Sequence, residues 1–334
     1  MKHAWMLAVL FAAAPVWTAL AADEAWRSGI GLSILENPKE AGREAATAAR
    51  KAFGEGEPKI VIVAAAIGQV VPGLVEGVAE HFPREIIYGS EVAVPLTPET
   101  NFPDAEELDI LAGVAVLALG GDIEVATAFE STAIEGTDNP YHENGRRLGA
   151  ALLPAVEAST RPGKLVLTFG NQHTGSNEAV VSGLQEALGG TVPIVGGAAG
   201  SSGKSAEAKE IVKGEIVTAY NVAILFAGRF RLGLAMGTGQ HKPATADKAM
   251  EDALAQGDGA EPMFAFIFDC RRRRQEMMEE NALAEEHGMF LKHMGSVPFF
   301  GFYGPGEIGT TGVGEPVIGT RFTVTTAVLF PVNE

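Results

Sequence analysis

The sequence predicts an α/β protein whose layered sheets are covered by helices. Continuous apolar runs such as KIVIVAAA (59–66) and FAFIF (264–268) are typical of strands that are buried on both faces by packed helices. Alanine-rich stretches with helical periodicity precede such runs. A pattern of strand, loop, helix and strand also recurs at a spacing of roughly 100 residues, which indicates an internally repeated architecture.

Three segments carry this repeat, at 59–93, 164–202 and 263–309, and each returns as a strand that contains glycine. An alanine-rich helix is expected ahead of each one, in PKEAGREAATAARKAF, GRRLGAALLPAVEAS and TADKAMEDALAQ. An apolar strand is expected after each one, in GVAVLALGG, NVAILFAGR and TVTTAVLFP. The chain is therefore predicted to consist of three related units with the order helix, strand, helix, strand, strand.

The N-terminus has the features of a secretory signal peptide. Lys2 and His3 precede an apolar run, and Ala19-Leu20-Ala21 has the spacing of a cleavage site. Pro15 interrupts the run, which is marginal against the roughly 20 residues that a membrane-spanning helix needs. We predict that residues 1–21 are removed and that the mature protein is exported, periplasmic or secreted, without membrane insertion.

The composition excludes some classes of binding partner. The chain has 25 Lys and Arg residues against 42 Asp and Glu residues, and this acidic balance argues against nucleic acid and anionic membranes as partners. Cys270 is the one cysteine of the sequence, so the chain forms no internal disulfide and depends on its core for stability.

Candidate ligand-binding residues lie where the chain is expected to leave a strand. Ligands of α/β proteins bind outside the carboxyl ends of strands, and glycine there lets backbone amides approach the ligand. The expected strand-exit loops are 88–91, 170–178, 195–202, 268–274 and 302–307. The candidates in these loops are Ser90, Glu91, Asn171, His173, Gly196, Gly197, Ser201, Arg271, Arg274, Tyr303 and Glu307.

Several motifs resemble the FIST family. FIFDCRRRR (266–274), followed by PFFGFYGPGEIG (298–309), is similar to the FIST C-terminal domain. IIYGSEVAVP, VPIVGGAAG and NVAILFAG are similar to the FIST N-terminal domain. The resemblance covers about 30 to 330. It implies an N-terminal domain of two units at 28–230 and a C-terminal domain of one unit at 231–334.

The resemblance also implies a function. FIST domains are sensory ligand-binding modules of signal transduction, with amino acids proposed as ligands and haem in some members. In this chain GLAMGTGQH passes almost directly into TADKAMEDALAQ, so the long β-rich section usual between the halves is absent. Nothing resembles a kinase, cyclase or receiver domain, so a separate exported or membrane signalling protein is the expected partner.

The arginines at 271–274 are placed unusually, because they begin a helix whose dipole disfavours positive side chains. They indicate an anionic ligand or a buried carboxylate, whereas Arg272 and Glu276 have the spacing of a surface pair. Cys270 is either a buried structural residue or a thiolate nucleophile. Asp269 is expected to cap the helix.

No cofactor is expected, and no metal site is predicted because no HxH or HExxH spacing occurs. Haem remains an alternative, with His173, His241 or His293 as an axial ligand. GGAAGSSGKS (196–205) has Ala198 where a phosphate-binding P-loop requires its first glycine, and is interpreted as a glycine turn that lines the ligand cleft.

The sequence favours a protein that binds a small polar ligand, such as an amino acid, without turnover. No GxSxG elbow is present, so no catalytic residue is predicted. A hydrolase or transferase using Cys270 or a loop serine, and a scaffold for another exported protein, are the alternatives. Glu307 either accepts from an amine ligand or pairs internally with the arginines at 271–274, and the internal pair is favoured because a buried charge is usually matched by protein.

Overall fold

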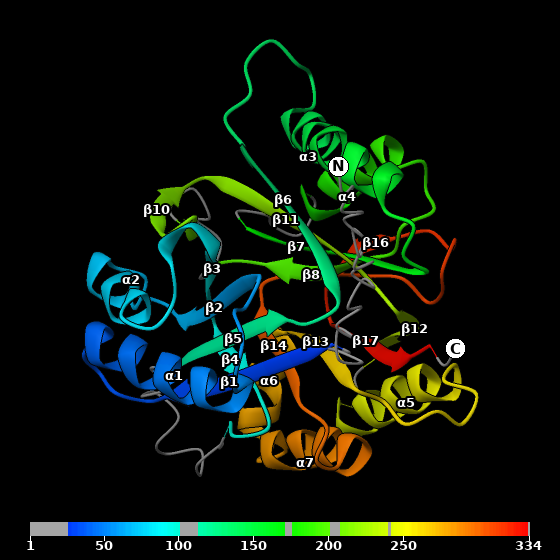
Figure 1. The fold of residues 1–334 in the computed structure, drawn as a ribbon. Helices are drawn as coiled ribbons and strands as arrows, with labels where there is room; N and C mark the ends of the chain where they lie inside the picture. The colour runs from blue at the N-terminus through cyan, green and yellow to red at the C-terminus, as the bar shows by residue number, and fades with distance from the viewer. Residues whose placement is uncertain (1–25, 101–112, 171–175, 201–207, 240–241, 333–334) are drawn as a thin grey trace, which may run out of the picture.

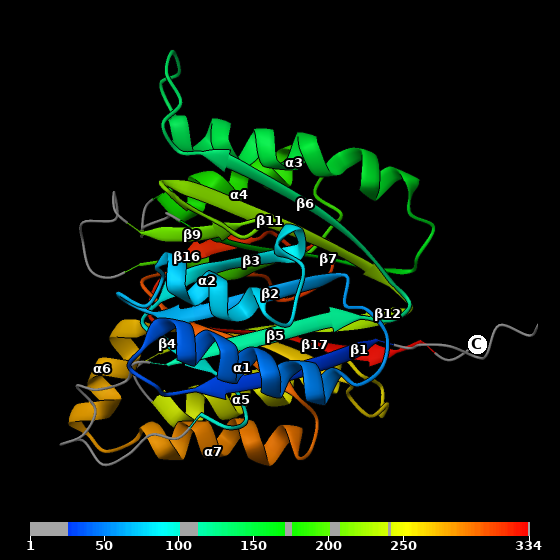
Figure 2. The same ribbon diagram turned by 60° about the vertical axis from the view of Figure 1, so that its left-hand side comes forward.

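The computed structural model describes residues 26–100, 113–170, 176–200, 208–239 and 242–332. The predicted signal peptide at 1–21 lies outside these residues. The α/β class and the three related units are confirmed: helices cover three mixed sheets (Figures 1 and 2). Within the described residues, no helix is long and apolar enough to span a membrane.

The first unit arranges its strands in the order β1-β5-β2-β3, with β2 and β3 parallel. A short 3-10 helix, Arg84–Ile86, precedes β3. Asn37 starts the first helix by accepting from the backbone N–H groups of Lys39 and Glu40. The elements are β1 (Arg27–Ser33), α1 (Pro38–Phe53), β2 (Ile60–Ala66), α2 (Pro72–Ala79), β3 (Ile87–Val92) and β5 (Val114–Gly120).

The second and third units repeat this arrangement, with the orders β6-β11-β7-β8 and β12-β17-β13-β14. The second unit contains β6 (Ile123–Ser131), α3 (Pro140–Ala158), β7 (Gly163–Gly170), α4 (Ser176–Ala187), β8 (Ile194–Ala198) and β11 (Tyr220–Gly228). The third contains β12 (Phe230–Thr238), α5 (Lys242–Ala255), β13 (Phe264–Cys270), α6 (Arg271–Glu279), α7 (Leu283–Met294), β14 (Phe299–Gly304) and β17 (Thr323–Pro331). Each unit thus begins with a strand, β1, β6 or β12, that the sequence patterns did not predict.

Each unit also sends strands into the sheet of another unit, and the exchange closes a ring. From the first unit, β4 (Val94–Leu96) pairs with β14 of the third. From the third, β15 (Glu307–Gly309) pairs with β8 of the second and with β16 (Ile318–Thr320). From the second, β9 (Lys209–Val212) pairs with β3 of the first and with β10 (Glu215–Thr218). Strands therefore cross the predicted boundary between 28–230 and 231–334, and that division stays a prediction.

The repeated glycines lie in strands rather than in loops, so this part of the loop prediction is wrong. Residues 88–91, 195–198 and 302–304 belong to β3, β8 and β14. A Cβ at Gly89, Gly196 or Gly301 would come within 2.3, 1.8 and 1.5 Å of a carbonyl oxygen on the neighbouring parallel strand. These glycines are therefore needed for close packing of two strands.

Four hydrophobic clusters hold the sheets and helices together. The central cluster joins inner faces of all three sheets and includes Ile62 of β2, Leu167 of β7 and Phe266 of β13. The other three clusters lie between each sheet and its own helices. Because both faces of the central strands are covered, their continuous apolar sequences follow from the architecture.

Candidate functional site

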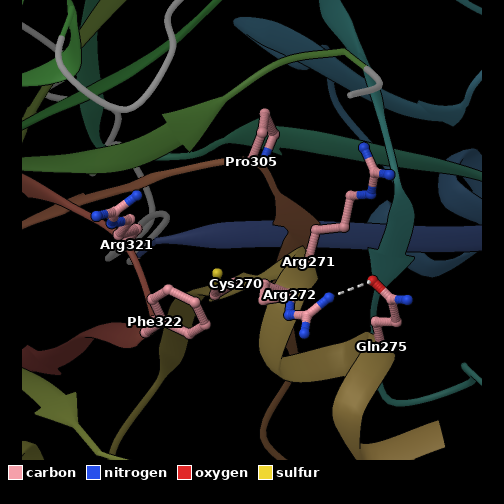
Figure 3. Close-up of a pocket in the computed structure, with 7 residues that line it drawn as sticks. All are labelled: Cys270, Arg271, Arg272, Gln275, Pro305, Arg321 and Phe322. Atoms are coloured by element: carbon pink, nitrogen blue, oxygen red, sulfur yellow. Dashed lines mark hydrogen bonds between the residues drawn. The ribbon is translucent and has the colours of Figure 1, made fainter. Parts of the chain in front are cut away.

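A cavity of about 280 Å³ opens where β13 ends and α6 begins. Three arginine side chains from two segments of the third unit line it, and none of the seven lining residues is acidic (Figure 3). In this view the sulfur of Cys270 lies between the side chains of Arg321 and Arg271. The lining residues are Cys270, Arg271, Arg272, Gln275, Pro305, Arg321 and Phe322.

Positively charged groups predominate among the described residues that line the cavity. Strand β13 runs directly into α6 without a loop, Cys270 is the N-cap residue, and the first turn of α6 contains no acidic residue. Unpaired backbone N–H groups at a helix N-terminus add positive potential to that of the arginines. Arg272 is held by Glu276 at 3.1 Å and by Gln275 at 3.2 Å. Among the described residues Arg321 makes no ion pair, so its guanidinium can bind a ligand.

Phe322 closes one side of the cavity with an exposed aromatic ring. Its φ of 59° is unusual for a residue with a side chain. Ala219 has the same φ of 59° and also stands immediately before the last strand of its unit. We call the pairs of exchanged strands, β9–β10 of the second unit and β15–β16 of the third, the exchanged arms. The same backbone geometry therefore occurs where the chain returns from each arm, and only the aromatic side chain is particular to the cavity.

A buried network of charges lies beneath the cavity. Arg273 is 1% exposed and its Nε donates to Oδ1 of Asp269 at 2.8 Å. Its Nη2 donates to Oε1 of Glu286 and to the carbonyl oxygen of Lys242. Tyr303 donates its hydroxyl to Oε2 of Glu286 at 3.0 Å. The network ties the start of α6 to α7 and β14.

Burial raises the pKa of both carboxyls in this network. For Asp269 the guanidinium of Arg273 opposes the rise, and for Glu286 the charge of Asp269 adds to it. Burial lowers the pKa of Arg273, but the two carboxyls more than offset this and the net shift is upward. The predicted cap is wrong in detail, because Asp269 accepts from the adjacent N–H of Cys270 while Cys270 itself occupies the N-cap.

Glu307 is fully buried behind Cys270 and holds the exchanged arm in place. Its Oε2 accepts from the hydroxyl of Thr323 at 2.8 Å and from the backbone N–H of Thr323 at 3.3 Å. Within the described part of the chain it makes no ion pair, so the predicted pairing with the arginines at 271–274 is wrong. Arg273 instead pairs with Asp269 and Glu286.

Glu210 occupies the equivalent position in the arm of the second unit. Glu210 faces Ser90 across β9 and β3, and Glu307 faces Gly197 across β15 and β8, in each case one residue past the closely packed glycine. Burial, and to a lesser extent Glu91, raise the pKa of Glu210 to about 9, although the backbone of Tyr220 lowers it. Two exchanged arms therefore each bury one glutamate.

The predicted ligand-binding residues separate into two groups. Arg271 lines the cavity, and Arg274, Tyr303 and Glu307 belong to the same unit but are not among the lining residues. Gly196 and Gly197 join this group because β8 pairs with β15.

The second group comprises Ser90 and Glu91, which lie in β3 of the first unit. There Glu91 accepts from the backbone N–H of Gly68 at 2.7 Å. Neither residue lines the arginine cavity. Asn171, His173 and Ser201 are outside the described residues.

Patterns in the sequence did not single out Arg321, Phe322, Thr323, Glu286 or Glu210. The sequence patterns favoured Arg271 and Arg274 over Arg273. Arg273 nevertheless lies four residues after Asp269, which is the spacing of an ion pair on a helix. For Glu210 a signal was present, because the arms of the second and third units contain the matching pairs Glu210-Ile211 and Glu307-Ile308.

Of the histidines proposed as haem ligands, His173 and His241 lie outside the described residues. Nε2 of His293 lies 2.6 Å from Oδ1 of Asp247, and His293 is not among the residues that line the cavity. Asp247, Glu251 and His293 together could hold a metal ion, but Lys292 also binds Asp247 at 3.0 Å and competes with a cation there.

A larger cavity of about 440 Å³ lies between the second and third units. Its lining is mostly apolar and includes Val192, Phe230 and Leu232. None of the described candidate residues lines it, so the arginine cavity remains the site that joins the predicted residues to a ligand-sized space.

The structure is that of an α/β protein built from three strand-exchanging units, the third of which contains an arginine-lined cavity. Family models match it at two places, the FIST N domain over residues 59–248 and the FIST C domain over residues 211–310. The chain belongs to the FIST family, and the resemblance seen in its motifs is confirmed. FIST domains are associated with sensory ligand binding in signal transduction.

The chain has little similarity to proteins of known function. No curated protein matches the chain. Cyanuric acid hydrolase from A. caulinodans is similar over 91% of this chain and 99% of its own, with 10% identity and a TM-score of 0.42. PurLQS from Thermotoga maritima is similar over 93% of this chain and 73% of its own, with 12% identity and a TM-score of 0.27. These scores are too low to support any conclusion about the fold or function of this chain.

Proposed function

We propose that this FIST protein senses a small organic anion, which binds in the arginine cavity without turnover. The observation that carries the proposal is the convergence of Arg271, Arg272 and Arg321 on one cavity, to which the described part of the chain contributes no carboxylate. Guanidinium groups bind carboxylates through paired hydrogen bonds, and the N-terminus of α6 adds backbone donors of the same sign.

The lining favours a small organic acid over an amino acid. An amino acid would bring an ammonium group into the cavity, where the three arginines would repel it and none of the described lining residues is a carboxylate that could accept its protons. Phe322 and Pro305 supply apolar surface for a short carbon chain. A dicarboxylate of a few carbon atoms therefore fits the chemistry of the site best.

Export and a partner complete the proposal. The signal-peptide features at residues 1–21 support action outside the cytoplasm, in the periplasm or as a secreted protein. The bound state would be read by a separate exported or membrane signalling protein.

Glutarate is expected to stabilise the protein against thermal unfolding. A ligand that binds the folded state alone adds about 2.7 kcal/mol at a concentration 100 times its Kd. The uncharged analogue 1,5-pentanediol is expected to give no shift, because it offers the arginines no negative charge. Scanning calorimetry with the two compounds measures this difference.

Two variants test whether glutarate binds in the arginine cavity. Arg321→Gln is expected to remove most of the glutarate shift, because it deletes the cavity arginine that has no ion pair in the described chain. Arg43→Gln makes the same charge change on the exposed face of α1 and is expected to keep the shift. An equal shift in both variants would show that glutarate binds elsewhere, and no shift in the unmodified protein would exclude glutarate as a ligand.

A further inference from the structure

The cavity of about 440 Å³ between the second and third units, which we call the junction cavity, has the size and lining of a site for an apolar ligand. Small-molecule sites enclose roughly 300–1,000 Å³ and are lined mainly by hydrophobic side chains with a few polar groups. Val192 and Phe230 form a buried part of the lining, whereas Val313 is 62% exposed. A hydrocarbon group that entered the cavity would therefore gain free energy by covering apolar surface.

Lys164 lines the junction cavity and has a counterpart in the first unit. Lys59 and Lys164 each lie four residues before the strand residue whose carbonyl oxygen faces a closely packed glycine, Val63 in β2 and Thr168 in β7. The two lysines therefore occupy equivalent positions, and their contacts show how the two junctions between units differ.

The lysine of the first unit closes its junction with a hydrogen bond. Nζ of Lys59 donates to the carbonyl oxygen of Ile123, the first residue of β6, at 2.6 Å. Phe230, the first residue of β12, has the equivalent place at the second junction. Within the described chain, Nζ of Lys164 instead reaches only the carbonyl oxygen of Arg161, at 3.5 Å, which is longer than an ordinary hydrogen bond. Its ammonium group is therefore available beside an open cavity.

Lys164 is the positive group that a ligand could use in the junction cavity. The other cation of the lining, Arg231, already donates through Nη1 to Oδ2 of Asp258 at 2.8 Å, and its guanidinium lies 5.8 Å from the centre of the Phe330 ring. Lys164 makes no ion pair with the described residues, and none of the described lining residues is acidic. A carboxylate that entered the cavity would therefore meet a lysine without a competing partner.

We propose that the junction cavity binds a monocarboxylate with a hydrocarbon body, such as a medium-chain fatty acid. Lys164 holds the carboxylate, and the chain lies against Val192 and Phe230. The site goes beyond the proposed function, because it takes a ligand of another class and shares no lining residue with the arginine cavity. A single available ammonium group selects one carboxylate, and the apolar lining favours a longer chain than a small dicarboxylate has.

Titration calorimetry with octanoate and octan-1-ol tests the proposal, because the two probes share the chain and differ in charge. Octanoate is expected to bind at one site per chain and about tenfold more tightly than octanol, the scale of a hydrogen bond to a charged group. Lys164→Met keeps the length of the side chain and should weaken octanoate about tenfold, while octanol binding stays unchanged. Lys59→Met makes the same change at the equivalent lysine and should leave both affinities unchanged.

Two further measurements place the hydrocarbon chain. Hexanoate should bind about tenfold more weakly than octanoate, since each buried CH₂ group contributes about fourfold in affinity. Thr191→Trp, at an exposed position of the lining, fills part of the cavity and should weaken octanoate and octanol alike. Octanoate should also bind unchanged in the presence of excess glutarate, because the two cavities are separate.

Several outcomes would overturn the inference. The absence of octanoate binding would exclude the ligand class, and equal weakening by Lys164→Met and Lys59→Met would remove Lys164 from the site. Displacement of octanoate by glutarate would place octanoate in the arginine cavity. Sedimentation of the protein with phosphatidylglycerol vesicles, without binding of free octanoate, would show that the cavity takes a membrane lipid instead of a free acid.

Discussion

Arg273→Leu is expected to destabilise the protein by about 3–5 kcal/mol, the usual cost of removing one partner from a buried ion pair. The substitution leaves Asp269 and Glu286 in an apolar interior without the guanidinium that both of them bind. Urea denaturation at pH 7 measures the loss as a lower midpoint at an unchanged slope.

Arg272→Leu is the matched control, because it changes the neighbouring residue of the same helix. Arg272 is largely exposed and pairs with Glu276 at the surface, so its loss is expected to cost about 0.5 kcal/mol or less. The deficit of Arg273→Leu should also shrink as the pH falls and the two stranded carboxyls take up protons. Equal losses in the two variants would contradict a stabilising buried network.

Stability is expected to fall as the pH rises from about 4.5 to about 9, and Glu210→Gln is expected to remove much of this dependence. The pKa of Glu210 is raised from 4.5 to about 9 in the folded protein, chiefly by burial. In this window the folded state keeps a proton that the unfolded state releases, so rising pH favours unfolding. At pH 7 the free energy of unfolding is therefore about 3 kcal/mol lower than at pH 4.5 because of this one group, at 1.36 kcal/mol per pKa unit.

Chemical denaturation at pH 5 and pH 8 tests this expectation. Glu210→Gln should match the unmodified protein at pH 5 and exceed it at pH 8. Glu215→Gln, at an exposed position on β10, should keep the unmodified slope. Part of the slope should persist in Glu210→Gln, because burial also raises the pKa of Asp269, Glu286 and Glu307. A Glu210→Gln slope identical to that of the unmodified protein would contradict the assignment.

The sequence predicted the elements whose periodicity is strong. The helix at Pro38–Phe53 has a buried alanine face, and strands such as Ile60–Ala66 are buried along their whole length, so both leave a clear pattern. The internal repeat supported these predictions further, because the same order of elements occurred three times.

The exchanged strands were not predictable in the same way. β4 and β15 have three residues each, which is too short for a period-two pattern, and their partners lie in other units. The role of the glycines was mistaken for the same reason. The clash that excludes a side chain at Gly301 comes from a carbonyl of the parallel strand, and local sequence does not show which strand is parallel.

The sequence marked the strand end at which the cavity opens, but it did not show the contacts that build the cavity. Cys270 and the arginines at 271–274 marked the end of a strand, and the cavity does open there. Which arginine turns inward depends on the position of Glu286 in α7, and Arg321 reaches the cavity only because its arm returns from the sheet of the second unit. Both facts are tertiary and leave no mark near residue 270.

Titration calorimetry with glutarate tests the central claim, anion binding in the arginine cavity, most directly. We predict one site per chain, at least tenfold weaker binding to Arg321→Gln than to Arg43→Gln, and weaker binding as salt screens the arginines. The absence of binding heat in the unmodified protein, or equal affinity in both variants, would contradict the account.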